Sequence, residues 1–270
     1  MTDFVETAEL PELMLVVALC FVGLTVISSA SGYALEYFLR GRRIWALPLD
    51  ANQTRTELIG NLVFLAIAIA SFSVVLHLRV ITFGADTALA TALTFLAMYF
   101  GFHAAYYALH RALHIRALVR FHRWHHVSRV TTPLSGQSMS AVEAIGWMYC
   151  YLGVPAAMSV VAPLSFNGWL LYMVYNVFGN IFGHSNVEMV PVLPGLRYTS
   201  LVNNVFTYHS LHHARWTGHY GFATTLADRI FGTEWDDWME LHQRTASGHP
   251  LTNLKVRGDA HAAVHPHVEG

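Results

Sequence analysis

Four long stretches of the chain contain no aspartate, glutamate, lysine or arginine. They are Leu13–Leu35, Leu58–Leu78, Thr87–His110 and Ala144–Val187. About 20 consecutive apolar residues form a helix long enough to cross the hydrocarbon core of a bilayer. The first three stretches therefore predict one membrane-spanning helix each, whereas the fourth is long enough for two.

The fourth stretch is expected to fold as a helical hairpin. Pro163, Asn167 and Gly168 lie near its middle, and these residue types favour a turn over a continuous helix. Its two halves are expected either to span the membrane at a tilt or to insert only in part. The predicted fold class is therefore all-α: an integral membrane helical bundle of about three spans plus the hairpin, with a histidine-rich helical cap on its cytoplasmic side.

The composition indicates that lipid is part of the solvent. Charged residues make up 12% of the chain, whereas soluble domains carry about 25%. The formal net charge is −1, so no strong field would attract nucleic acid. We expect residues 1–258 to form a single membrane domain. Residues 259–270 lack apolar periodicity and are expected to be a disordered tail.

The basic residues predict how the spans are oriented. Most of them follow the first span, the third span or the hairpin, and Arg79 alone would lie on the opposite side. The positive-inside rule then places the N-terminus outside and the C-terminus in the cytoplasm. Three crossings followed by a returning hairpin give the same orientation.

Several of the 17 histidines occur in clusters with helical spacing. His110 and His114 lie four residues apart, so they share one face of a helix. Two later triplets follow the spacing i, i+3, i+4, which also gathers three side chains on one face. These triplets are His122, His125 and His126, and then His209, His212 and His213. His184 follows the hairpin, and His219 follows the second triplet.

Clustered imidazoles in this number favour a site for two metal ions. Imidazole suits iron, zinc, copper and nickel, whereas magnesium and calcium prefer oxygen ligands. One metal takes about four to six ligands, so nine or ten histidines suit two metals with open positions. The clusters all fall at the predicted cytoplasmic end of the spans or in the cap. Isolated histidines are more often packing residues, as we expect for His77, while both roles stay open for His103.

The residues around the clusters extend the pattern. The flanking segments are Tyr107 with His110–Arg111, Arg120–His126, Phe182–Asn186, Tyr220–Gly221 and Asp228–Thr233. With the order of the histidine motifs, they resemble the fatty acid hydroxylase and sterol desaturase superfamily over about residues 90–240. The sequence departs from that pattern at three places: His103 stands where members often have Asp, Ser140–Glu143 replaces His-Pro-x-Glu, and His219 replaces Asn.

The resemblance implies an O2-dependent di-iron enzyme that hydroxylates or desaturates a lipid such as a fatty acyl chain or a sterol. Zinc is expected as a substitute for iron in recombinant material, because the two share ligand preferences. The implied ligands are His110, His114, His122, His125, His126, His184, His209, His212 and His213, with His219 as a further candidate. Glu143, Glu188 and Asp228 lie near the clusters and are candidates for orienting the imidazoles.

The implied chemistry needs external electrons. The chain offers no segment for a reductase and lacks the His-Pro-Gly-Gly signature of a fused cytochrome b5. A separate donor is therefore expected, namely a ferredoxin, a rubredoxin-like protein, or a cytochrome b5 with its reductase.

Two other classes of protein use intramembrane histidines. A haem b cytochrome needs isolated histidines at matched depths on different spans, and the triplets fit this poorly. A metal transporter needs polar ligands along a path through the middle of the bilayer, whereas these histidines gather at one end.

Overall fold

The computed structural model describes residues 2–258, and it contains helices and no strand within that range. In chain order the elements are α1 (Thr2–Thr7), α2 (Leu10–Phe38), η1 (Arg40–Arg42), α3 (Gln53–His77), α4 (Ala88–Leu113), α5 (Val119–His122), η2 (His125–Val127), η3 (Ser135–Gln137), α6 (Ala141–Met148), η4 (Tyr149–Gly153), α7 (Val154–Val161), α8 (Phe166–Gly183), α9 (Leu196–Thr199), α10 (Phe206–Arg215), α11 (Leu226–Phe231) and α12 (Trp238–Ala246). The predicted all-α class is thus confirmed, and the tail at 259–270 lies outside the described residues.

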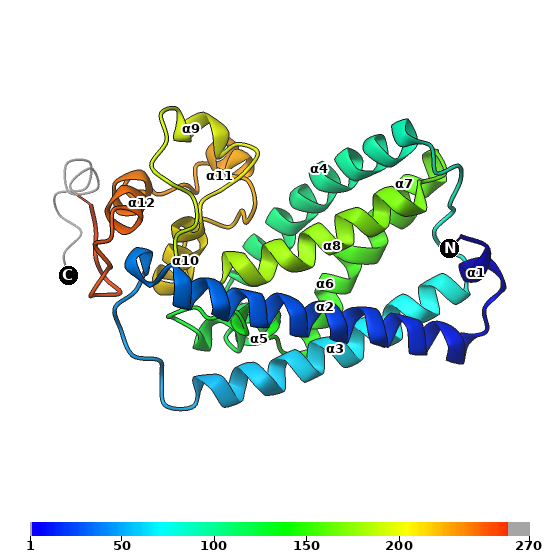
Figure 1. The fold of residues 1–270 in the computed structure, drawn as a ribbon, viewed down its shortest axis with the longest axis horizontal. Coiled ribbons are helices and arrows are strands. Elements are labelled where there is room, and N and C mark those ends of the chain that lie inside the picture. The colour runs from blue at the N-terminus through cyan, green and yellow to red at the C-terminus, as the bar shows by residue number, and fades with distance from the viewer. Residues whose placement is uncertain (1, 259–270) are drawn as a thin grey trace.

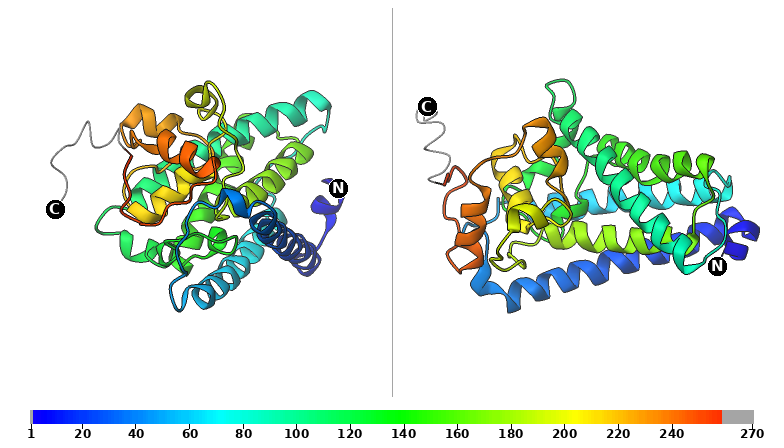
Figure 2. Two further views of the ribbon diagram at one scale, coloured as in Figure 1. Left: turned by 60° about the vertical axis from the view of Figure 1, so that its left-hand side comes forward. Right: turned by 90° about the horizontal axis from the view of Figure 1, so that it is seen from above.

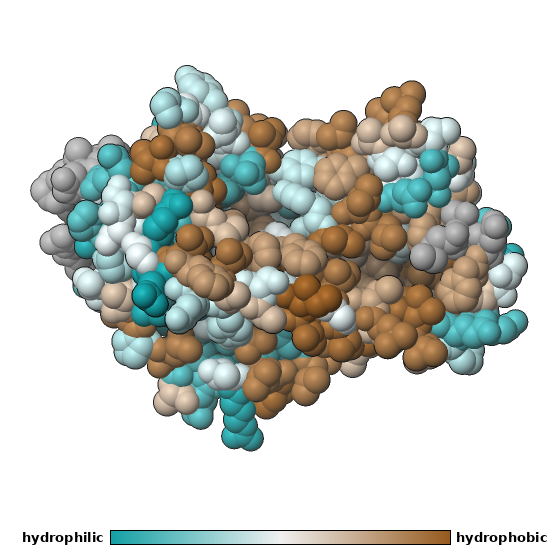
Figure 3. Space-filling view, viewed as in Figure 1, coloured by the Kyte–Doolittle hydropathy of each residue, from teal (hydrophilic) through white to brown (hydrophobic). Residues whose placement is uncertain are grey.

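The long helices run side by side and form the bundle (Figures 1 and 2). The spans predicted from the first three apolar stretches are confirmed as α2, α3 and α4, each long and apolar enough to cross a membrane. Residues 141–161 form a fourth such helix, in which η4 is a π-helical turn between α6 and α7. Large apolar side chains such as Leu19, Leu62 and Leu89 are exposed on the bundle, and the surface over these helices is largely hydrophobic (Figure 3). Such a surface suits contact with lipid.

The predicted hairpin is present, but its turn differs from the expected one. Ala162 adopts an extended conformation, as residues before proline tend to do, and this ends α7 before Pro163. Asn167 and Gly168 do not form the turn; they lie in the first turn of α8, where the Gly168 amide donates to the Ser165 side chain. A Cβ at Gly168 would lie 2.5 Å from the Thr91 carbonyl oxygen. Glycine is therefore needed there for the close packing of α8 on α4.

The cap lies at one end of the bundle and has a hydrophobic core of its own. Helices α9 to α12 gather at that end, opposite to the N-terminus (Figure 1). Trp45, Tyr208 and Trp238 are buried together in this second core, and the Trp45 indole N–H donates to the Ser210 hydroxyl at 2.6 Å. Because Trp45 follows α2 while Tyr208 and Ser210 belong to α10, this core fixes α10 against the end of the bundle.

Candidate metal centre

Nine of the ten candidate ligands meet at the end of the bundle that carries the cap. They form two groups, and within each group one nitrogen per residue lies within 4.8 Å of all the others. The first group is His110, His114, His122, His126 and His212. The second group is His125, His184, His209 and His213. His114 is half-buried and the other eight are buried.

The local structure explains how these side chains converge. His110 lies in the last turn of α4, and His114 and His184 are the C-cap residues that directly follow α4 and α8. The second triplet occupies one face of α10, as its spacing predicts. The first triplet does not lie on a single helix: α5 ends at His122, and the other two histidines belong to η2.

Each triplet supplies ligands to both groups, which its spacing alone does not predict. His125 belongs to the second group, whereas its neighbour His126 belongs to the first. Likewise, His212 belongs to the first group and His213 to the second. The rings of His126 and His213 have centroids 4.8 Å apart, so the two groups are direct neighbours.

Six of the nine imidazoles have a partner that determines their tautomer. Five Nδ1 atoms lie 2.6–3.2 Å from backbone carbonyl oxygens, which only accept hydrogen bonds. The pairs are His110 with Tyr220, His125 with Ser138, His184 with Asn180, His212 with Gly218, and His213 with Ser128. A sixth, His122, has its Nδ1 2.7 Å from a carboxylate oxygen of Glu143. The proton is thus held on Nδ1, and the Nε2 lone pair is free to bind a metal.

These free lone pairs face one another. The Nε2 atom of His126 lies 3.1 Å from Nε2 of both His122 and His212. In the second group, Nε2 of His209 lies 3.0 Å from that of His184 and 3.1 Å from that of His213. The Nε2 atoms of His126 and His209 each have two such neighbours, and a proton on either nitrogen could be donated to only one of them. Each group therefore keeps at least one pair of lone pairs in contact, which is unfavourable unless a cation lies between them.

The spacing of the nitrogens also fits a metal ion. With metal–nitrogen bonds of about 2.1 Å, adjacent ligands at right angles lie about 3.0 Å apart. The observed contacts of 3.0–3.1 Å match this value. The chemistry of the donor set therefore fits a metal in each group.

Burial keeps the imidazoles outside the spans neutral. It lowers the pKa of His125 to about 4 and that of His184 to about 3. Burial, followed by the neighbouring imidazoles, holds the pKa of His212 and His213 well below the usual range. Neutral imidazole is the form that binds metals, so the site is ready for metal at physiological pH.

Of the three acidic residues singled out from the sequence, Glu143 touches a histidine of the site directly. Its Oε1 accepts from His122 Nδ1 at 2.7 Å and from the indole N–H of Trp147 at 3.2 Å. Its position in the first turn of α6 is fixed by Ser140, whose side chain accepts from the Glu143 amide. This arrangement is a carboxylate–histidine pair of the kind that orients metal ligands.

Replacing Glu143 by leucine is expected to weaken metal binding in the first group. Loss of such an outer partner typically lowers metal affinity by about 10–100-fold. A competition titration of purified protein with a chelator measures this affinity. The Glu143→Gln variant, which keeps an acceptor oxygen, should lie between Glu143→Leu and the wild type, and equal affinity for all three would refute the role.

The other two acidic residues, Asp228 and Glu188, act through the backbone segments that they hold in place. Asp228 accepts from the amides of Tyr220 and Gly221 at 2.8 and 2.7 Å, and the Tyr220 carbonyl in turn accepts from His110. Glu188 accepts from the amide and hydroxyl of Thr207 at 2.8 and 2.7 Å. Asp228 thus holds a carbonyl that orients a histidine, whereas Glu188 fixes the start of α10.

Sequence reasoning missed Glu57, which lies in α3 with its side chain fully buried. Its carboxylate accepts from the side chains of Gln53, Ser128 and Thr132, each at 2.8 Å. The Ser128 carbonyl accepts from His213 Nδ1, so Glu57 supports the loop that orients a ligand. The available signal was an acidic residue at the end of a predicted span on the side of the histidines, where ionisable groups are commonly functional.

His219 and His103 lie outside both groups. His219 Nδ1 lies 3.0 Å from the Tyr208 carbonyl, and its Nε2 accepts from the Trp235 amide at 2.8 Å. Its ring stacks on that of Tyr208 with centroids 3.6 Å apart. His103 packs edge-on against Tyr99 in α4, with centroids 4.7 Å apart. Both nitrogens of His219 are thus engaged in joining α10 to the chain that follows it.

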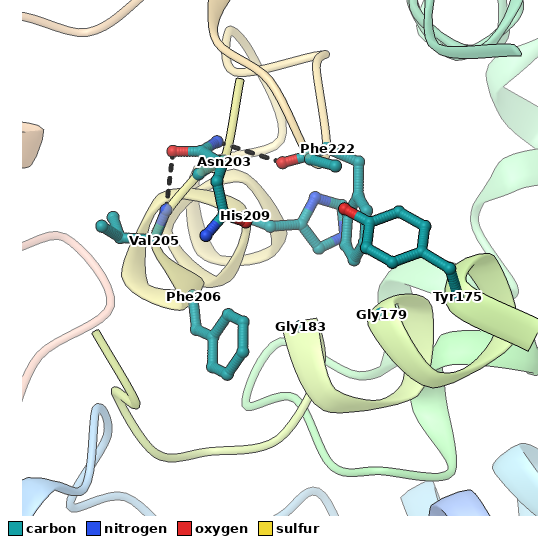
Figure 4. Close-up of a pocket in the computed structure, with 10 residues that line it drawn as sticks. Tyr175, Gly179, Gly183, Asn203, Val205, Phe206, His209 and Phe222 are labelled. Carbon is teal, nitrogen blue, oxygen red and sulfur yellow. Dashed lines mark hydrogen bonds between the residues drawn. The ribbon is translucent and has the colours of Figure 1, made fainter. Parts of the chain in front are cut away.

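A pocket adjoins the second group between α8 and the start of α10 (Figure 4). Tyr175 and His209 reach into it from these two helices, and Phe206 and Phe222 add aromatic walls. The pocket holds about 350 Å³ of space, including its open side. A small molecule or a chain end could therefore approach the second group from this direction.

The fold and the site define a class of protein: a helical bundle suited to a membrane, with two adjacent histidine groups that could hold metal ions at one end. Residues 95–233, more than half of the chain, match the fatty acid hydroxylase family. The chain belongs to this family and hence to the superfamily that its motifs predicted.

Similar proteins come from plants. The very-long-chain aldehyde decarbonylase GL1-6 of Oryza sativa subsp. indica is 35% identical over 148 residues, which cover 51% of this chain and 22% of that protein. Protein CER1-like 2 of Arabidopsis thaliana is 34% identical over 143 residues, 50% of this chain and 22% of the relative. The very-long-chain aldehyde decarbonylase CER1 of Arabidopsis thaliana is 31% identical over 145 residues, with the same coverage. The chain thus matches about a fifth of the length of these relatives. No solved structure matches the chain.

Proposed function

We propose that the chain is a membrane-bound, O2-dependent di-iron oxygenase that hydroxylates or desaturates an unactivated C–H bond of a lipid. The observation that carries this proposal is the pair of adjacent histidine groups, in which neutral imidazoles turn their lone pairs toward one another. Membership of the fatty acid hydroxylase family supports the lipid as substrate.

The nine histidines of the two groups would hold the metals, and His219 would not, since both of its ring nitrogens are hydrogen bonded elsewhere. When bound, an iron pair supplies the activation of O2 needed to attack an unactivated C–H bond. The protein orients the imidazoles through Glu143 and five backbone carbonyls. Burial of eight of the nine ligands keeps bulk water away, which protects a reactive centre from side reactions.

The proposal includes the orientation expected from the basic residues, with the C-terminus and the site on the cytoplasmic side. It also includes a separate electron donor of the ferredoxin, rubredoxin-like or cytochrome b5 type. Arg116, Arg120 and Arg123 are exposed on the segment that carries His114 and His122. Their charge would suit an acidic donor, because complementary charge guides the encounter of two proteins.

A second candidate is the cleavage of a long-chain aldehyde. It is favoured by the relatives named as very-long-chain aldehyde decarbonylases. The same histidine groups would serve both reactions, because both reactions require the end or the middle of a hydrocarbon chain to lie beside a metal pair. The product distinguishes them, since only the cleavage shortens the chain.

A haem fits this site less well than two separate metals. Haem ligation needs imidazoles on opposite faces of a flat ring, with the ring between them. Here, nitrogens of the same group lie 3.0–3.1 Å apart, which leaves space for an ion and none for a macrocycle.

The decisive experiment combines metal analysis with isotope labelling. Protein purified in detergent with iron should contain about two irons per chain, one for each histidine group, and no haem absorption. Incubation with ¹⁸O2, a reductant system and straight-chain lipids should give a labelled alcohol for hydroxylation or an unlabelled alkene for desaturation. A shortened hydrocarbon would favour the second candidate. A haem spectrum, or no product from any lipid with two irons bound, would overturn the proposal.

A further inference from the structure

The pocket beside His209 lies against one histidine group and not the other. Its lining includes His209 of the second group, and none of the five histidines of the first group is among the described residues that line it. Its space is about 350 Å³ when the open side is included, so the enclosed part is small. Such a space suits one narrow chain end rather than a fused ring system.

At two glycines of α8, the helix lines this pocket with backbone and no side chain. Gly179 and Gly183 lie one helical turn apart and both line it. A Cβ built on Gly179 would have no atom within 4 Å, so the space in front of it is open. A Cβ on Gly183 would overlap the Phe222 ring. One glycine thus keeps the pocket open, and the other makes room for Phe222.

Phe222 lines the pocket next to the second group. Its ring centroid lies 5.4 Å from that of His184 and 4.7 Å from that of His209, nearly parallel to the first and perpendicular to the second. Asn204 fixes its backbone: the side-chain amide of Asn204 donates to the Phe222 carbonyl at 3.1 Å, and the backbone N–H of Asn204 donates to the Ala223 carbonyl at 2.9 Å. The ring is therefore held in place beside two of the four histidines.

We propose that this pocket is the route by which a substrate chain reaches the second histidine group, and that Phe222 is the positioning residue that sets which carbon lies there. This inference rests on the proposed function. The occupant is a single unbranched hydrocarbon chain. Val202, which directly precedes the lining residue Asn203, is 55% exposed. An exposed apolar side chain next to the pocket suits a hydrocarbon chain that enters from the bilayer.

The test uses the metal-loaded full chain in lipid nanodiscs and a straight-chain fatty acid with a photoactivatable diazirine near its methyl end. In the wild type, mass spectrometry should find crosslinks in the peptides that contain Gly179 and Phe222. The Gly179→Leu side chain would fill the pocket, so crosslinking there should fall by about tenfold, which corresponds to about 1.4 kcal/mol of binding. Gly23→Leu is the matched control, because a Cβ on Gly23 in α2 also meets no atom within 4 Å and lies outside the pocket.

The Phe222→Ala variant tests the positioning role. Removing the ring should let the chain advance toward His184 and His209, so the position of the oxygen or double bond in the product should move along the chain. A merely structural role of Phe222 would lower the yield without moving that position. The inference is overturned if Gly179→Leu crosslinks like Gly23→Leu, or if the label falls in the apolar groove lined by Val17, Phe72 and Trp169.

The two proposals fail in different ways. Crosslinks at the pocket without product from any lipid would refute the proposed function and leave the binding route in place. Product formation with equal activity in Gly179→Leu and Gly23→Leu would refute the route and leave the proposed function in place.

Discussion

The His209→Ala variant is expected to lose the metal of the second group and to lower activity by at least about 100-fold, because even an outer-shell partner contributes about 10–100-fold. His209 is the central residue of its group: its Nε2 lies 3.0–3.1 Å from the Nε2 atoms of His184 and His213. Its loss removes one of four ligands. Metal analysis of the purified variant, together with its rate of product formation, measures both effects.

His126→Ala is the corresponding change in the first group, where His126 lies 3.1 Å from both His122 and His212. His77→Ala provides the control. His77 is an exposed histidine at the C-terminal end of α3 and belongs to neither histidine group. Full metal content and activity in both His209→Ala and His126→Ala would exclude the two groups as the metal site.

The Glu57→Ala variant is expected to be less stable than the wild type. It removes the acceptor of three buried donors, on Gln53, Ser128 and Thr132. Each buried donor left without a partner costs about 1–3 kcal/mol. Because the Ser128 carbonyl orients His213, metal affinity of the second group should fall together with the melting temperature.

Thermal unfolding in detergent, followed by circular dichroism with and without added metal, tests this expectation. Glu57→Gln keeps one acceptor oxygen of similar geometry and should show an intermediate melting temperature. An unchanged melting temperature for Glu57→Ala would mean that the hydrogen-bond network does not support the fold.

Apolar runs without charge were sufficient to predict the three spans and the hairpin, since a bilayer imposes a minimum length on each helix. Histidine spacing likewise predicted that His209, His212 and His213 share one face of α10. Both predictions depend on neighbours along one helix. Side chains within a few residues of each other are related by the helical period alone.

The features that sequence could not predict depend on how separate segments meet. Glu57 lies in α3, yet its role follows from a loop more than 70 residues later. His219 stands where family members often have Asn and was a candidate ligand, but its stacking on Tyr208 and its hydrogen bond from the Trp235 amide arise only when separate parts of the cap meet. Glycine is a common turn residue, so the sequence placed Gly168 in a turn. Only the position of the Thr91 carbonyl oxygen shows that Gly168 allows close helix packing.

The division of each H-x-x-H-H triplet between the groups has a consequence for how the protein matures. Neither histidine group belongs to one segment: the first draws on the end of α4, α5, η2 and α10, and the second on η2, the end of α8 and α10. A nascent chain that stops before α10 would lack His209, His212 and His213, and would complete neither. Any metal that these groups bind would therefore enter only after α10 has been synthesised, and the same helix completes both groups.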